Sequence, residues 1–103
     1  MNGLIVLEPY ATQIINGEKE LEFRDKKPPV HNRNIPIYLL SGGFILGKIK
    51  IFGFGIRHNP GSKYYWRIKV LSKYKTKRKY KHPNGAQIWV KDVGTRKVQT
   101  RLD

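Results

Sequence analysis

The chain contains no cysteine, and no apolar stretch in it comes near the length of a membrane-spanning helix. The missing cysteines exclude disulfides and thiolate metal sites and are typical of a reducing compartment. A spanning helix needs about 20 apolar residues. The apolar run Leu4–Leu7 follows no basic segment and ends at Glu8, which does not fit a secretory signal peptide. These absences predict a cytoplasmic protein that is not inserted in a membrane.

Acidic residues are also scarce, and none lies between Lys26 and Lys91. The 21 lysines and arginines outnumber the seven aspartates and glutamates, which gives a formal net charge of +14. Such a charge repels itself and weakens the compact state unless a polyanion neutralises it. Nucleic acid is the commonest polyanionic partner and a membrane surface the second. We expect RNA as the partner, with single-stranded DNA as the alternative, and a monomeric protein.

Apolar periodicity predicts one short helix and five or six strands. A helix is expected between Pro9 and Gly17, because Ala11, Ile14 and Ile15 share one helical face. Strands are expected at 4–7, 20–24, 35–40, 44–56, 64–71 and 88–90, with a loop at 26–34 and turns at 41–43, 59–61 and 84–85. The predicted fold is mainly β with one or two short helices, a small α+β domain whose five to six strands form a barrel that removes exposed edges.

The predicted domain covers residues 1–92, and the basic tail 93–103 is expected to be ordered only in part. The sequence predicts further features of two of these strands. In 44–56 the apolar phase changes at Phe52, and Gly53 and Gly55 suit the bulge that such a change needs. In 64–71 the alternation predicts an inward-facing Trp66.

Residues 63–81 form the most basic part of the chain. Lysines occupy odd positions there, and tyrosine, threonine and arginine alternate with them, so an extended segment would present a row of ammonium groups on one face. Cations track a phosphate backbone, and tyrosine rings offer stacking surfaces for unpaired bases. The alternative is a solvated lysine-rich loop without function. The predicted contacts on this basic surface are Lys48, Lys50, Arg67, Lys69, Lys73, Tyr74, Lys75, Lys77, Arg78, Lys79, Tyr80 and Lys81.

A second informative stretch is Gly17–Arg24. The order of residues in this stretch places Lys19 at a helix–strand junction and puts Glu22 and Arg24 on one face of the following strand. Three ionisable groups on one side of a short barrel strand can line a cleft. The alternative is a surface row of ion pairs, which is common and contributes little.

The spacing Gly-x-Lys-x-x-Glu-x-Arg resembles the signature of the ASCH domain, a branch of the PUA-like barrels. Other stretches agree in order along residues 3–92. They are Pro9-Tyr10-Ala11 with Ile14-Ile15, Ile37-Tyr38, Ile45-Leu46-Gly47-Lys48-Ile49, and His82-Pro83-Asn84-Gly85-Ala86-Gln87 before Trp89-Val90.

The resemblance implies a β-barrel with a cleft beside the strand that follows Lys19, and a role in RNA binding. Carried over by motif position, Lys19, Glu22 and Arg24 would line that cleft, and Ser41 would face it from the end of a later strand. We expect no cofactor.

Some proteins of this family are enzymes. One bacterial type resembles an amidohydrolase of acetylated cytidine that uses the motif lysine, a threonine three residues later and a more distant glutamate. Here Lys19 matches, but Glu22 replaces the threonine and no glutamate follows it. A lysine nucleophile also needs a lowered pKa, which neighbouring glutamates oppose.

A metal-independent ribonuclease is the other alternative. His31, His58 or His82 could act as acid or base, with Lys19 or Arg24 as the cation. Each histidine is isolated in the sequence, and neither their spacing nor the carboxylates indicate a metal site. We therefore interpret the chain as a nucleic-acid-binding module rather than an enzyme, with Lys19 the best catalytic candidate if it were one.

Overall fold

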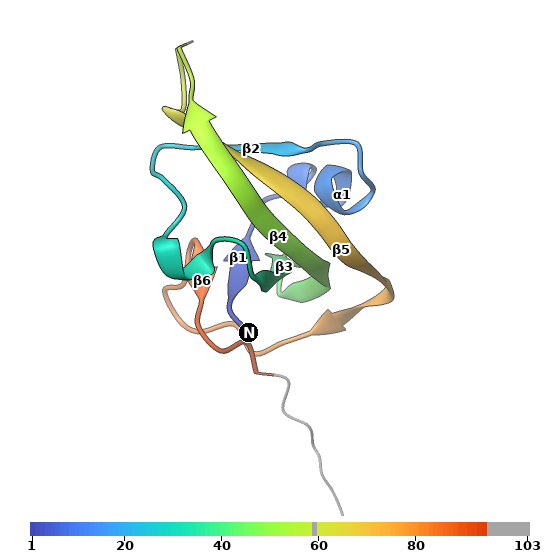
Figure 1. Ribbon diagram of the computed structural model, residues 1–103. Helices are drawn as coiled ribbons and strands as arrows, with labels where there is room; N and C mark the ends of the chain where they lie inside the picture. The colour runs from blue at the N-terminus through green and yellow to red at the C-terminus, as the bar shows by residue number, and fades with distance from the viewer. Residues whose placement is uncertain (59, 95–103) are drawn as a thin grey trace, which may run out of the picture.

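The computed structural model describes residues 1–58 and 60–94 as one curled sheet with a short helix on it (Figure 1). The elements in chain order are β1 (Gly3–Ile5), α1 (Tyr10–Ile15), β2 (Leu21–Arg24), the 3-10 turn η1 (Val30–Asn32), β3 (Pro36–Ser41), β4 (Phe44–Ile56), β5 (Tyr64–Lys79) and β6 (Trp89–Val90). The predicted class, a small mainly β domain with one or two short helices and a barrel-like sheet, is confirmed.

The six strands form one sheet in the order β2-β5-β4-β3-β1-β6. All neighbours are antiparallel except β1 and β3. The long hairpin of β4 and β5 runs diagonally across the molecule, and the shorter strands curl away from it on both sides (Figure 1). The curl brings Trp89 of β6 onto Trp66 of β5, and Arg24 of β2 lines the same cavity as both rings.

The main core lies inside the curl, on the face that α1 covers. Ala11, Ile14 and Ile15 of α1 are buried there, as the helical spacing predicted. Apolar side chains of four strands meet them: Leu4, Ile37, Leu39, Ile49, Ile51, Trp66 and Ile68, with Val6 beside β1. We call this the inner face of the sheet.

A second, smaller core lies on the opposite, outer face. Leu40, Ile45, Val90 and Val93 are buried there, and Tyr38, Tyr74 and Tyr80 pack against them. Val93, the first residue of the predicted tail, therefore belongs to the packed structure, and its backbone N–H bonds to the Met1 carbonyl. Residues 95–103 of that tail lie outside the described part of the chain.

Three irregularities break the register of the hairpin. Phe52 of β4 is an extra residue between the pairs Ile51–Ile68 and Gly53–Arg67, so the predicted phase change is a bulge. Leu71 of β5 is a second extra residue, between the pairs that Val70 and Ser72 form. Both bulged side chains are exposed. The third irregularity lies between the Gly47–Lys73 and Ile45–Arg78 pairs, where β5 bows away from β4.

Several predicted boundaries were wrong. The strand expected at 4–7 is paired only over Gly3–Ile5, and the strands expected at 20–24, 35–40 and 88–90 differ by one residue at one or both ends. β5 continues from Leu71 to Lys79, because its polar half pairs with β4 again on both sides of the third irregularity, through Ser72 and Lys73 and then through Arg78 and Lys79. The loop at 26–34 contains η1, which Pro29 precedes. The predicted turn at 59–61 includes Asn59, which lies outside the described residues. No helix among the described residues is long and apolar enough to cross a bilayer.

Candidate nucleic-acid interface

The curled sheet does not close through backbone pairing. β2 and β6 are its two end strands, and within residues 1–58 and 60–94 no ladder joins them. Side chains bridge the gap instead. Arg24 of β2 donates from Nη2 to the Ile5 carbonyl of β1 at 2.9 Å, and the indoles of Trp66 and Trp89 stack with their centroids 6.0 Å apart and a 20° angle between planes. We call this line of contact the seam.

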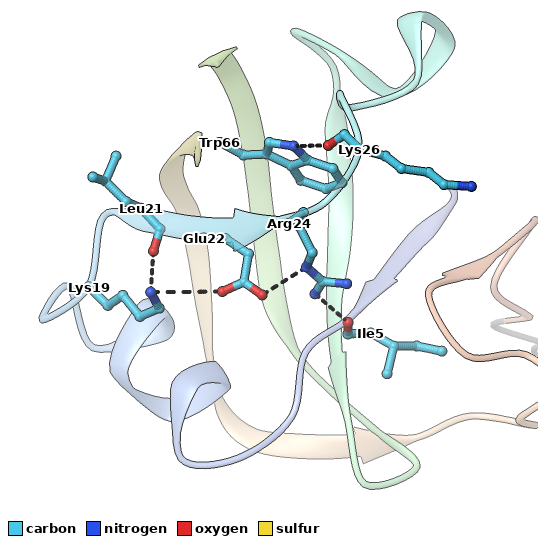
Figure 2. Close-up of polar contacts among 7 residues, drawn as sticks. All are labelled: Ile5, Lys19, Leu21, Glu22, Arg24, Lys26 and Trp66. Carbon is cyan, nitrogen blue, oxygen red and sulfur yellow. Dashed lines mark hydrogen bonds and ion pairs between the residues drawn. The ribbon is translucent and has the colours of Figure 1, made fainter. Parts of the chain in front are cut away.

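The predicted cluster of Lys19, Glu22 and Arg24 forms one network at the seam (Figure 2). Glu22 and Arg24 lie on the inner face, since Glu22 pairs with the buried Trp66. The Glu22 carboxylate accepts a hydrogen bond from Arg24 Nε at 2.9 Å and lies 3.9 Å from Lys19 Nζ. Lys19 also donates to the Leu21 carbonyl. The Glu22 side chain is only 10% exposed, so these cations are the partners that its burial requires.

Trp66 is the fixed wall of the seam. It is 2% exposed, its Nε1 donates to the Lys26 carbonyl at 2.8 Å, and the Arg24 guanidinium lies 5.6 Å from its ring centroid (Figure 2). The Lys26 bond ties the chain that leaves β2 to the middle of the sheet. Trp89 approaches from β6 and is half-buried.

A cavity of about 470 Å³ opens at the seam. That volume lies within the roughly 300–1,000 Å³ range of small-molecule sites. Its walls are mainly aromatic and aliphatic and its polar residues are mainly cationic: Phe23, Arg24, Asp25, Lys26, Lys27, Pro29, Ser62, Trp66, Ile88 and Trp89. The motif thus lies beside a cleft, but of its three polar residues only Arg24 lines this one. Lys19 lines a different, shallower hollow with Glu20 and Phe52.

The outer face carries a separate, cationic surface. Residues directly opposite in antiparallel strands project on the same face. Lys50 is opposite Lys69, Lys48 is opposite Tyr38, and Arg67 is opposite Gly53, so all these side chains share the outer face. Arg78, opposite Ile45, extends the surface to the second core and lies 4.5 Å from the Tyr74 ring. We call Lys48, Lys50, Arg67, Lys69 and Arg78 the cationic outer face.

The predicted single row of lysines along β5 was wrong at Lys73. The Leu71 bulge shifts the alternation by one, so Lys69 projects on the outer face and Lys73 on the inner side, opposite Gly47. Lys73 there bonds to Asn16 at the end of α1. There is no room for a side chain at Gly47, because an added Cβ would lie 2.1 Å from the Ser72 carbonyl oxygen.

The outer face has its own aromatic rings, near the ends of β2 and β5. The Arg57 guanidinium lies 4.0 Å from the Phe23 centroid, and that of Arg67 lies 5.4 Å from the Tyr65 centroid. Tyr65 lies flat over Gly55, where a Cβ would come within 2.2 Å of its hydroxyl. Phe23 is 40% exposed and also lines the seam cavity, so it connects the cavity with the outer face.

The far end of β5 holds the remaining predicted contacts. Lys75, Lys77, Lys79 and Lys81 are exposed, and Lys77 lies 4.4 Å from the Phe44 ring. Burial, followed by the charge of neighbouring Tyr38, raises the pKa of the Tyr74 phenol, and burial raises that of Tyr80.

Ser41 is buried at the end of β3 and is not among the residues that line the seam cavity.

The three histidines do not meet at the motif. His82 bridges the Tyr80 hydroxyl at 2.8 Å and the Ala86 carbonyl at 2.9 Å, His58 is exposed, and His31 lines a neighbouring cavity with Asn32 and Trp89. None of them lines the cavity of Arg24 or the hollow of Lys19. Within the described ranges, no three His, Asp or Glu residues gather as a metal site.

Sequence reasoning missed the seam residues Trp66, Trp89, Lys26 and Lys27. Trp66 was assigned to the core, where it also lies, and Lys26 and Lys27 were placed in a loop. The available signal was that both tryptophans of the chain follow turn segments, one in each of two strands that the fold brings together. Three strands separate β5 from β6 in the sheet order, so only the curl of the sheet brings the two tryptophans together.

No model of a known protein family matches the chain, and no curated protein matches it either.

Proposed function

We propose that the protein is a nucleic-acid-binding module whose preferred ligand is single-stranded RNA. The observation that carries the proposal is the cationic outer face, where Lys48, Lys50, Arg67, Lys69 and Arg78 share one surface of the sheet. It lies inside a stretch of the sequence without a single carboxylate. Phosphate contacts from such cations supply most of the affinity of sequence-independent nucleic-acid binding.

Aromatic rings beside the cations, one exposed and two half-buried, favour a single strand over a duplex. Phe23, Tyr65 and Tyr74 each lie beside an arginine of the same surface. Unpaired bases stack on aromatic rings and on arginine planes, whereas paired bases in a duplex present only their edges. Resemblance to the ASCH signature supports RNA over DNA, and we propose membership of that family on the same grounds.

A salt series with a labelled single-stranded RNA tests the proposal. We expect log K to fall linearly with log salt, with a slope of about −0.7 for each phosphate contact. Binding that does not depend on salt, or no binding at low salt, would contradict the proposal. The same samples, held in EDTA and run on a denaturing gel, should contain intact RNA; fragments would instead indicate the ribonuclease. Double-stranded RNA of the same length is the control ligand and should bind more weakly.

A further inference from the structure

We infer that the seam cavity, which Trp66 and Trp89 both line, is a binding site for one unpaired nucleobase together with its 5′-phosphate. The inference rests on the proposed function and adds to it a second, selective contact, separate from the cationic outer face. Of the three polar residues of the sequence motif, only Arg24 lines this cavity.

The walls of the cavity suit a flat, aromatic ligand. Trp66 and Trp89 are nearly parallel, Phe23, Ile88 and Pro29 complete an apolar lining, and the Trp66 ring is held by its bond to Lys26. Small-molecule sites are typically apolar concavities with a few convergent polar groups. A base stacked on an aromatic side chain gains about 1–3 kcal/mol, which is about 5- to 150-fold in affinity.

The polar residues of the cavity suit an anion beside that ring. Lys26 and Lys27 line it and are both exposed. Arg24 lines it too, held by Glu22 and the Ile5 carbonyl. Asp25 is the one acid among the lining residues, and its carboxylate can accept hydrogen bonds from base N–H groups. Apolar walls with cations and one acceptor match a nucleotide better than they match a lipid tail or a sugar.

The position of the cavity allows one strand to use both surfaces. Phe23 lines the cavity and packs under Arg57 of the outer face, at the free edge of β2. A single strand with one base at the seam can therefore pass over Phe23 and continue along Arg67 and Lys69. A duplex cannot do this, because its bases are paired and stacked.

Tryptophan fluorescence reads this site directly, because the two tryptophans of the chain both line the cavity. We expect nucleoside 5′-monophosphates to quench the emission with saturation, nucleosides to do so about ten-fold more weakly, and ribose 5-phosphate not to quench. In a proton–nitrogen NMR spectrum both indole N–H signals should shift with the nucleotides. Equal quenching by ribose 5-phosphate would overturn the inference, since the site would then bind only an anion.

Two sets of variants distinguish the contribution of the Trp89 ring to binding from that of the lysine charges. Trp89→Leu should lower nucleotide affinity at least five-fold, read from the Trp66 emission, and Trp89→Phe should retain most of it. The double change Lys26→Gln and Lys27→Gln should weaken monophosphates about ten-fold and leave nucleosides unaffected, while Lys26→Arg with Lys27→Arg should restore binding. Unchanged nucleotide affinity in folded Trp89→Leu would overturn the inference. If that variant does not fold, the ligand series on the unmodified protein decides.

The two proposals fail differently. Salt-dependent RNA binding without any change in tryptophan emission, from RNA or from nucleotides, would overturn the seam site and leave the proposed function intact. Quenching by nucleotides without any RNA binding would retain the cavity as a mononucleotide site and overturn the proposed function.

Discussion

The seam and the outer face use cations in opposite ways. At the seam, Arg24 and Lys19 pair with the carboxylate of the nearly buried Glu22, so their charge mainly stabilises the fold. On the outer face, Lys50 and Lys69 are opposite one another across two strands with no carboxylate in that part of the sequence. Like charges in direct opposition destabilise a sheet. The difference indicates that Arg24 and Lys19 stabilise the fold at the seam, whereas we propose that the cations of the outer face contact a ligand.

Neutralising the outer face should give the largest effect. The triple change of Lys48, Lys50 and Lys69 to Gln removes three phosphate contacts, which should reduce the salt slope by about 2 and the affinity for single-stranded RNA at 0.1 M salt by about 100-fold. Anisotropy titrations over a salt series measure both. The same three positions changed to Arg keep the charge and should bind as the unmodified protein does. An unchanged affinity of the Gln variant for single-stranded RNA would show that the outer face is not the interface.

Glycines on the two faces offer the next comparison. At Gly47 an added Cβ meets the Ser72 carbonyl, which is backbone and cannot move without opening the hairpin. Gly47→Ala should therefore destabilise the fold by about 2 kcal/mol. At Gly55 the Cβ meets only the Tyr65 ring, which can swing away, so Gly55→Ala should cost less and expose that ring. Thermal unfolding of both variants tests this, and equal melting temperatures would contradict the assignment.

Features that depend on residues close together in the chain could be predicted from the sequence. Periodicity predicted β4 with correct ends, the helical face of α1 and the bulge at Phe52, because each depends on neighbours in the chain. The Lys19–Glu22–Arg24 network was also predictable, because its members lie within six residues of one another.

Long-range geometry was not predictable from the same patterns. A one-residue bulge at Leu71 reverses the face of everything that follows, so Lys73 left the row that its odd position predicted. The stack of Trp66 on Trp89 depends on how tightly six strands curl, which no local pattern encodes. The seam cavity therefore emerged only from the structure.

Removing the seam charge should affect the fold more than the outer face. Glu22→Gln keeps the shape of the side chain but leaves Arg24 and Lys19 without their anion, which should destabilise the protein by about 1 kcal/mol. The affinity of the outer face for RNA should not fall, because no outer-face cation is lost. Glu18→Gln makes the same change of charge at an exposed position and is the matched control. A larger loss of RNA affinity than of stability would contradict the division between the two regions.

The smallest effect is expected at alkaline pH, at the Tyr74 end of the outer face. Burial raises the pKa of the Tyr74 phenol above its ordinary value of 10.0. The neutral phenol therefore stabilises the folded state fully below pH 10, and this contribution is lost as the pH rises through the folded pKa. Tyr74→Phe removes the titrating group, so its melting temperature should fall less between about pH 9 and pH 11 than that of the unmodified protein. Tyr10→Phe, at an exposed position of α1, should follow the unmodified protein, and parallel curves for Tyr74→Phe and Tyr10→Phe would refute the assignment.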